Sequence, residues 1–373
     1  MVRKFENSIQ VTHPSLPPLE SYITLLKKVW DSAWLTNMGP LHMEFEKKLQ
    51  AYLKMDFLTL FTNGHLALES ALKVLELKGD VITTPFTFAS TVHAISQCGL
   101  NPVFCDIKAN DYTIDEAKIE ALITSRTCAI LPVHVYGYPC NVKRIAEIAK
   151  KNNLKVIYDA AHVFGVKINE VPIGCYGDIS MFSFHATKVF HTIEGGMLTY
   201  KDETIGDRLN ALKNFGIIDS ETISTIGFNA KMNEFQAAMG LLNLELISQN
   251  IQQRKMITIT YRNALRNIPG IRFLDDSPSV KHNYAYFPIE IDSAVFGISR
   301  DLLHDKLKEY NIFTRKYFYP LANDYDCYKQ RYSSLDTPIA KDVSERILVL
   351  PLSPELSADD TETICDIIRQ NIS

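Results

Sequence analysis

The sequence contains no run of about 18 apolar residues, so it predicts no membrane-spanning helix. It has no basic surplus either, because 39 Lys and Arg residues against 43 Asp and Glu residues give a net charge of −4. This balance argues against nucleic acid or an anionic membrane as a partner, since both require a cationic surface. The polar start, Met1–Asn7, leads into no apolar stretch and predicts no secretory signal.

Cysteine is scarce, with seven scattered residues and no Cys-x-x-Cys pair. The usual spacing of a zinc site or a thioredoxin-like motif is therefore missing, and we predict no metal site. An odd number of scattered cysteines is typical of free thiols, so we expect a cytoplasmic protein. Gly and Pro number only 16 each, which excludes collagen-like and low-complexity chains.

What the sequence does have is a regular alternation of strand-like and helical segments. The strand-like segments are 56–64, 80–88, 101–107, 127–137 and 154–161, and the helical segments between them are 65–77, 89–99, 113–123 and 141–153. Strands that alternate with helices of about 10–15 residues predict an α/β fold, with a mainly parallel sheet and helices on both faces. For a chain of 373 residues we expect two or three domains.

The alternation changes after residue 175. Segments 178–187 and 194–200 are both strand-like without a helix between them, so we expect a hairpin or mixed pairing there. A helical stretch over 234–267 follows and is predicted to link two domains, 1–245 and 246–373. The second domain is expected to be a smaller α+β unit. Its predicted strands are 284–291 and 312–319, and its predicted helices are 299–311 and 358–371.

Polar side chains follow the predicted strands at the points where these strands end. In an open α/β sheet, ligands bind at the carboxyl ends of the strands. An acid, a lysine, a flat aromatic and a glycine turn at this edge together suit pyridoxal phosphate, which forms a Schiff base with lysine and needs an anion at its ring nitrogen. We assign Lys188 to the Schiff base and Asp159 to the ring nitrogen.

The remaining cofactor contacts follow from the same arrangement. Backbone N–H groups of Gly64 and His65, at the start of a helix, are expected to bind the phosphate. Ser183 adds a hydroxyl donor, and Phe88 is expected to stack on the ring face.

Each of these residues also has an ordinary structural explanation. Lys188 alone would be a surface lysine, Asp159 could cap the next helix, and Phe88 could be a core residue. The joint placement of the set at consecutive strand ends favours the cofactor. A nicotinamide-dependent enzyme is disfavoured, because no Gly-x-Gly-x-x-Gly motif follows the first strands.

Three strings carry a resemblance to a known family. YDAAHVFG (158–165), SFHATKVFHTIEGGML (183–198) and GFNAKMNEFQAAMG (227–240) resemble the DegT/DnrJ/EryC1 family of nucleotide-sugar aminotransferases. The resemblance extends from 34–40 to 348–357. It implies the fold-type I architecture of pyridoxal-phosphate-dependent aminotransferases and a homodimer with two shared active sites.

The resemblance also implies roles for single residues. By resemblance, Lys188 is the Schiff-base lysine, Asp159 the ring-nitrogen partner, His162 the contact to the ring hydroxyl, Ser183 a phosphate contact, Phe88 the stacking aromatic and Asn229 a phosphate contact from the neighbouring subunit. One departure is His65, where the family usually has Ser or Thr. Its backbone N–H remains, and an imidazole could still donate one hydrogen bond to a phosphate oxygen.

The substrate expected from the resemblance is a nucleotide-linked keto-deoxysugar, with L-glutamate as amino donor and 2-oxoglutarate as its product. VTHPSLPPLESY and DAAHVFG are most similar to members that aminate dTDP-4-keto-6-deoxyglucose at C4, giving dTDP-4-amino-4,6-dideoxyglucose for O-antigen and lipopolysaccharide. The alternatives are a C3-aminating relative and a non-catalytic cofactor-binding regulator. A sister branch of dehydratases has His at the lysine position, so Lys188 favours transamination.

Three residues are expected to contact the sugar or the nucleotide, namely His185, Tyr317 and Tyr319. The aromatic residues of 317–319 could equally belong to a strand that packs the smaller domain.

Overall fold

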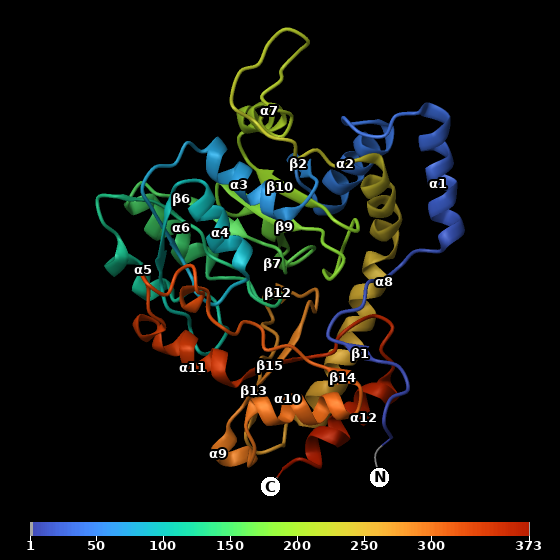
Figure 1. The fold of residues 1–373 in the computed structure, drawn as a ribbon, viewed down its shortest axis with the longest axis vertical. Helices are drawn as coiled ribbons and strands as arrows, with labels where there is room; N and C mark the ends of the chain where they lie inside the picture. The colour runs from blue at the N-terminus through green and yellow to red at the C-terminus, as the bar shows by residue number, and fades with distance from the viewer. Residues whose placement is uncertain (1–2, 373) are drawn as a thin grey trace.

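The computed structural model describes residues 3–372 and is built around a seven-stranded sheet (Figure 1). The strands stand in the order β2-β10-β9-β6-β5-β3-β4. Their bounds are β2 Phe57–Phe61, β3 Asp80–Thr83, β4 Asn101–Phe104, β5 Thr127–Ile130, β6 Lys155–Asp159, β9 Ile179–Ser183 and β10 Gly196–Tyr200. Strand β10 runs antiparallel to β2 and β9, and the other neighbours pair in parallel. The predicted mainly parallel sheet and the β9–β10 hairpin are confirmed.

Helices cover both faces of this sheet. Helices α3 (Gly64–Val74), α4 (Ala89–Gln97) and α7 (Glu203–Leu212) pack on one face, and α2 (Pro40–Leu53), α5 (Glu116–Leu122) and α6 (Val142–Lys151) on the other. Successive strand residues point to opposite faces, so Ile157 of β6 packs with the first group and Val156 with the second. Each large apolar side chain buried in these two cores contributes about 1.5–3 kcal/mol. The predicted α/β layers are confirmed.

Helix α8 (Glu234–Leu265), 32 residues long, runs from the sheet into the C-terminal part (Figure 1). It begins at a capping box, in which Asn233 and Gln236 each accept the other's backbone N–H through their side chains. The continuous helix expected over 234–267 is confirmed. The expected boundary between 245 and 246 lies inside α8, and the division into 1–245 and 246–373 stays a prediction.

The C-terminal part contains an antiparallel sheet in the order β11-β13-β15. The strands are β11 Ile271–Phe273, β13 Phe287–Ile291 and β15 Ile347–Leu350, and the helices packed against them are α10 Arg300–Glu309 and α12 Ala358–Arg369. Their apolar core includes Tyr261 from the end of α8, Leu303 of α10 and Ile364 of α12. The predicted α+β organisation agrees with this arrangement.

The strand predicted over 312–319 was wrong beyond its first residues. Strand β14 spans only Ile312–Phe313 and pairs in parallel with β1 (Ile9–Gln10). The chain then turns, and the Tyr319 N–H donates to the Lys316 carbonyl over 2.8 Å. Alternating aromatic residues imitate a strand in the sequence, but here tertiary contacts decide the local conformation.

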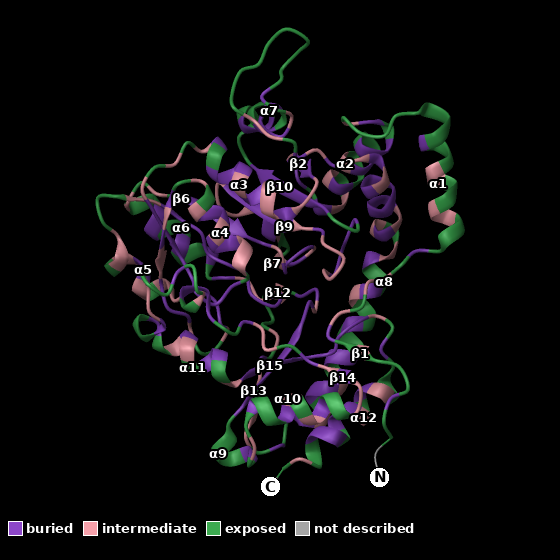
Figure 2. Cartoon of the chain, in the orientation of Figure 1, coloured by how far each residue is buried: buried purple, intermediate pink, exposed green. Residues whose placement is uncertain are grey.

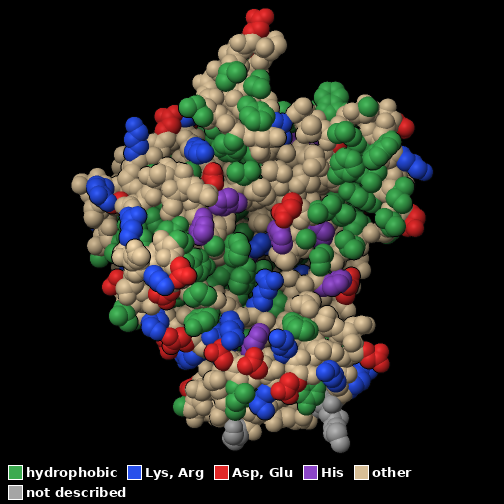
Figure 3. Space-filling view, viewed as in Figure 1, with side chains coloured by type: hydrophobic (Ala, Val, Ile, Leu, Met, Phe, Trp, Pro, Cys, Tyr) green, Lys and Arg blue, Asp and Glu red, His purple; other side chains and the backbone are tan. Residues whose placement is uncertain are grey.

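The remaining helices and strands are α1 Leu19–Ser32, β7 Lys167–Ile168, β8 Val171–Pro172, β12 Val280–Lys281, α9 Ser293–Phe296 and α11 Pro338–Arg346, with 3-10 turns at Ile173–Cys175, Ala322–Asp324 and Ser334–Asp336. Within residues 3–372, no helix is both long and apolar enough to cross a membrane. The strands of the large sheet are mostly buried, whereas the loop beyond α7 (217–226) is exposed (Figure 2). Figure 3 shows apolar side chains gathered over α1 and α2.

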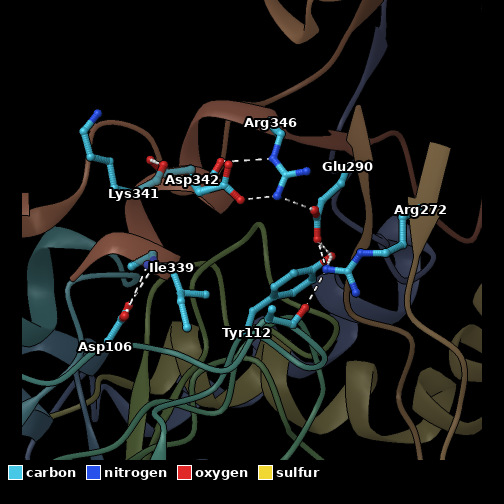
Figure 4. A network of polar contacts seen from close by, with 11 residues as sticks. Asp106, Tyr112, Arg272, Glu290, Ile339, Lys341, Asp342 and Arg346 are labelled. Atoms are coloured by element: carbon cyan, nitrogen blue, oxygen red, sulfur yellow. Dashed lines mark hydrogen bonds and ion pairs between the residues drawn. The ribbon is translucent and has the colours of Figure 1, made fainter. Parts of the chain in front are cut away.

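A polar network joins the large sheet region to the C-terminal part (Figure 4). Glu290 of β13 is buried and accepts the Tyr112 hydroxyl over 2.7 Å. Arg272 of β11 and Arg346 of α11 are ion-paired with the same carboxylate. Near this network, Asp106 accepts the backbone N–H groups of Ile339 and Ala340 in the first turn of α11. The two parts of the chain are therefore fixed to each other by two buried carboxylates, those of Glu290 and Asp106.

Replacing the central carboxylate should loosen this connection. In Glu290→Gln, Arg272 and Arg346 lose their buried counter-charge, and we expect the free energy of unfolding to fall by about 1–3 kcal/mol. Urea denaturation measures this change. The control is Glu345→Gln, which removes an exposed ion pair with Lys341 on α11 and should change stability by less than about 0.5 kcal/mol. Equal stability of the two variants would contradict a connecting role for Glu290.

Candidate active site

A cavity of about 550 Å³ lies at the carboxyl ends of the parallel strands. Most of the predicted site residues line it, namely Gly64, His65, Phe88, Asp159, His162, Ser183, His185, Lys188 and Tyr317. These residues come from separate loops and meet because parallel strands all end at the same edge of the sheet. Figure 3 shows histidine, basic and acidic side chains around the hollow in the middle of this face.

Asp159 ends β6 at the floor of the cavity. Asp159 is only 5% exposed. Its carboxylate accepts hydrogen bonds from the Thr91 hydroxyl over 2.7 Å and from the Ala161 N–H over 3.1 Å. Burial raises the pKa of the Asp159 carboxyl, whereas these two hydrogen bonds and the Lys188 ammonium act to lower it. A carboxylate withdrawn from water in this way favours a cationic group opposite it.

His162 lies beside Asp159 and is held as a neutral ring. Burial, with the nearby Lys188 ammonium, lowers the pKa of His162 well below its ordinary value. Its Nδ1 accepts the backbone N–H of Tyr136 over 3.2 Å, so the ring proton is on Nε2. His162 can therefore donate one hydrogen bond from Nε2 to an oxygen in the cavity.

The start of α3 forms a cradle for an anion. The Asn63 side chain caps the helix by accepting the Leu66 N–H over 2.8 Å. The N–H groups of the first turn have no partner inside a helix, which makes this end suitable for a phosphate. Gly64 packs so closely on Ser183 that a Cβ at Gly64 would lie 3.0 Å from the Ser183 Cβ. A side chain at position 64 would fill the cradle.

The His65 imidazole takes part in a different contact from the one expected. Its Nδ1 lies 2.8 Å from the Ser90 hydroxyl, and its Nε2 lies 2.8 Å from the Gln97 side-chain oxygen and 3.1 Å from a Glu69 carboxylate oxygen. Because both ring nitrogens have partners, the imidazole is not available to a phosphate oxygen in this arrangement. The backbone N–H is the group that His65 can offer to the cradle.

Lys188 and Phe88 face the cavity from opposite loops. Lys188 follows β9, and its backbone N–H donates to the His185 carbonyl over 2.9 Å. The His185 ring is turned toward Thr187, 2.8 Å from its hydroxyl. Phe88 precedes α4 and is 54% exposed, although it is a large apolar residue in a cavity wall. Its free ring face is suited to stack on a flat ligand.

Two predicted residues do not line this cavity. Tyr319 packs over the Arg300 guanidinium of α10, 5.1 Å from its ring centroid, so the expected substrate contact is not supported. The turn after β14 is the reason, because Tyr317 and Tyr319 would share a face only in a strand. Asn229 is exposed and forms an isolated antiparallel β-bridge with Asn214, at the base of the loop beyond α7. It makes no contribution to its own chain's cavity.

Other residues of the site were missed in the sequence. The Thr91 hydroxyl donates to the Asp159 carboxylate from the first turn of α4. In the sequence, only its place three residues after Phe88 indicates a position near the site. Arg315 lines the cavity from the C-terminal part, for which no local pattern exists. Among residues 3–372, no cluster of three or more His, Cys, Asp or Glu side chains could hold a metal ion.

The residues present fit pyridoxal phosphate. The cavity offers a buried anion in Asp159, an amine in Lys188 and a hydrogen-bond donor in His162. The cradle of Gly64 and Ser183, which a Cβ would fill, suits a phosphate, and the exposed ring of Phe88 suits an aromatic face.

Comparisons with known proteins agree with this geometry. The chain is 44% identical to the dTDP-4-amino-4,6-dideoxy-D-glucose transaminase of Shigella dysenteriae, over 98% of this chain and 99% of the relative. A structure of DesI in the presence of its TDP-sugar product is similar with a TM-score of 0.94 and 33% identity, over 99% and 94% of the two chains. The pyridoxal-phosphate form of a putative sugar aminotransferase from Streptococcus pneumoniae, Spr1654, gives a TM-score of 0.90 at 25% identity, over 98% and 100%.

The family profile matches nearly the whole chain, over residues 20–369. The family resemblance found in the sequence motifs and the expected aminotransferase fold are both confirmed. The chain belongs to the DegT/DnrJ/EryC1/StrS aminotransferase family.

Proposed function

We propose that this enzyme is a pyridoxal-phosphate-dependent aminotransferase that converts dTDP-4-keto-6-deoxyglucose to dTDP-4-amino-4,6-dideoxyglucose, with L-glutamate as the amino donor. The observation that carries the proposal is the cavity in which Asp159, His162 and Lys188 meet at two neighbouring strand ends. The product is supported by the 44% identity to transaminases of that name from Shigella dysenteriae and Escherichia coli. We further propose that the enzyme supplies this amino sugar for O-antigen and lipopolysaccharide synthesis.

The alternatives are a C3-aminating enzyme and a non-catalytic regulator. The names of these two relatives favour neither alternative. A cytoplasmic location is supported by the seven free cysteines, since thiols stay reduced there.

When bound, pyridoxal phosphate supplies an aldehyde to which an amine can add and a ring that takes up electrons from a deprotonated carbon. Lys188 Nζ is the group that would hold the aldehyde carbon. As a free amine, Lys188 would act as the general base and acid that moves the proton of the donor's α-carbon. The loop position of Lys188 beside the floor of the cavity supports this double role.

The other residues hold and orient the ring. Asp159 keeps a proton on the ring nitrogen, because its buried charge is stabilised by a cation opposite it. His162, with Nδ1 already accepting the Tyr136 N–H, would donate from Nε2 to the ring hydroxyl oxygen. Ser183 and the first N–H groups of α3 would bind the phosphate, and Phe88 would cover one face of the ring and exclude water.

His185 and Tyr317 are our proposed contacts for the sugar or nucleotide, since both line the cavity. Donor and keto sugar use this single cavity in turn. We therefore expect 2-oxoglutarate to leave before the sugar binds, which gives ping-pong kinetics.

A homodimer is the second part of the proposal. The loop beyond α7 exposes Ile218, Ile223 and Ile226, the last of them 96% exposed. Trp30, Trp34 and Met43 of the α1–α2 region are each at least half exposed, at 68%, 50% and 59%. Exposed apolar surface of this extent is typical of a protein–protein interface. A second copy that covers it would allow Asn229 to reach the phosphate in its neighbour's cavity.

The reaction is tested by supplying the purified protein with pyridoxal phosphate, L-glutamate and dTDP-4-keto-6-deoxyglucose. We expect the 4-amino product, identified by NMR, and a loss of about 1,000-fold or more in kcat for Lys188→Ala. Lys188→Arg is the matched control, because it keeps the positive charge near Asp159 but offers no neutral amine, and it should be equally inactive. Transamination by either variant would exclude Lys188 as the reacting amine.

The role of Asp159 gives a prediction about rate and pH. Asp159→Asn should retain the cofactor through the phosphate cradle but slow kcat by about 100-fold or more, because the ring nitrogen loses its anion. Thr91→Val keeps the carboxylate and removes a hydrogen bond that lowers its pKa. The pKa of Asp159 then rises, so the acidic limb of the kcat–pH profile should move to higher pH. An unchanged rate in Asp159→Asn would contradict the assignment.

The shared site is tested by mixing two inactive variants. Lys188→Ala and Asn229→Asp, refolded together, form mixed dimers in which one site has both native residues, so about a quarter of the native activity should return. A mixture of Lys188→Ala and Asp159→Asn is the control, because both residues come from the same chain and no native site can form. Equal recovery in the two mixtures, or none in either, would argue against sites shared between subunits.

A further inference from the structure

The cavity has two Lys or Arg side chains in its lining, Lys188 and Arg315. Lys188 is assigned to the cofactor, and the phosphate has its own cradle at the start of α3. Arg315 is therefore a second basic side chain in the site, and the cofactor chemistry does not use its guanidinium.

The backbone of Arg315 is held firmly against the C-terminal sheet. Its N–H donates to the Val349 carbonyl over 3.2 Å, and the Val349 N–H donates to the Arg315 carbonyl over 2.8 Å. Two residues on, the Tyr136 hydroxyl donates to the Tyr317 carbonyl. The next ring, Phe318, stacks on Tyr136 with an interplanar angle of 6°. The segment that carries Arg315 is thus fixed on both sides of it.

The guanidinium of Arg315, in contrast, has no carboxylate partner among residues 3–372. Its contact there is the Tyr317 ring, with the guanidinium carbon 5.8 Å from the centroid. The neighbouring Lys316 is different, since it pairs with Asp301 over 2.6 Å. Arg315 therefore presents a free, pre-positioned fork of N–H donors to the cavity, a group suited to carboxylates and phosphates.

Tyr317 shows which wall of the cavity Arg315 belongs to. The Tyr317 ring lies 6.4 Å from both Phe88 and His162, the residues proposed for the ring face and the ring hydroxyl. Burial raises the pKa of Tyr317 to about 12, so its hydroxyl stays protonated and does not compete for the guanidinium. Arg315 therefore belongs to the wall that carries the residues proposed to contact the cofactor's ring.

We propose that Arg315 is a substrate-binding residue that takes an oxyanion of the reactants. The inference rests on the proposed function, in which both reactants are anions. The oxyanion is either a carboxylate of the amino donor or the diphosphate of the keto-sugar nucleotide. Arg315 is then the group that holds the reactant's charged end while Lys188 moves the proton.

The test compares Arg315→Gln, which keeps the length of the side chain and removes its charge, with Lys316→Gln as the matched neighbour. Steady-state rates are measured with each substrate varied in turn. We expect Arg315→Gln to lower kcat/KM by about tenfold or more for one substrate, Arg315→Lys to restore part of it, and Lys316→Gln to change neither. A loss confined to glutamate assigns the donor carboxylate, and a loss confined to the sugar nucleotide assigns the diphosphate.

Calorimetry gives a readout that does not depend on turnover. Glutarate and dTDP are titrated separately into the protein loaded with pyridoxal phosphate, and the Arg315→Gln variant should bind one of them about tenfold more weakly. Unchanged binding of both probes, with unchanged kcat/KM for both substrates, would overturn the role of Arg315. Absence of transamination in the native protein would instead refute the proposed function, while the binding difference would still decide the role of Arg315.

Discussion

The buried carboxylate of Asp159 is the constraint on which the site depends. An ionised side chain at the end of a buried strand is stable only if hydrogen bonds and a nearby positive charge replace water. Thr91 and the Ala161 N–H supply two hydrogen bonds, and Lys188 supplies the charge. Burial also keeps His162 neutral, and the Tyr136 N–H donated to its Nδ1 fixes the ring proton on Nε2. A buried anion thus lies at the bottom of the cavity beside a neutral hydrogen-bond donor. A ligand with a cationic ring is favoured there.

The position of this floor follows from the sheet. Strands β2, β3, β5, β6 and β9 run in the same direction, so their following loops meet at one edge. That edge brings together an anion cradle from α3, an apolar ring before α4 and the lysine loop after β9. The opposite wall comes from the C-terminal part, which Glu290, Tyr112 and Arg272 attach to the sheet region. Substrate contacts on that wall, including Arg315, therefore depend on a network outside the cavity.

Much of this could be read from the sequence, because the relevant signals are local. Alternating apolar segments predict a parallel sheet, and polar residues just past each strand predict the loops that meet at its edge. Lys188, Asp159 and His162 were identified in this way and through the family motifs. Where the signal was ambiguous, the prediction failed. The aromatic residues after Phe313 resemble a strand in the sequence, but the chain turns after β14. Because of this turn, Tyr319 faces α10 and not the cavity.

The sequence by itself determined the alternation of elements, the family and the residues that follow each strand, since all of these depend on spacing along the chain. Only the tertiary structure decided which side chains share the cavity. In the folded chain the His65 imidazole contacts Ser90 and Gln97. Arg315 lines the same cavity as Lys188, although the two residues are about 130 positions apart in the sequence. Such choices depend on how separate elements pack and on which polar groups find partners there, and no local pattern of residues records them.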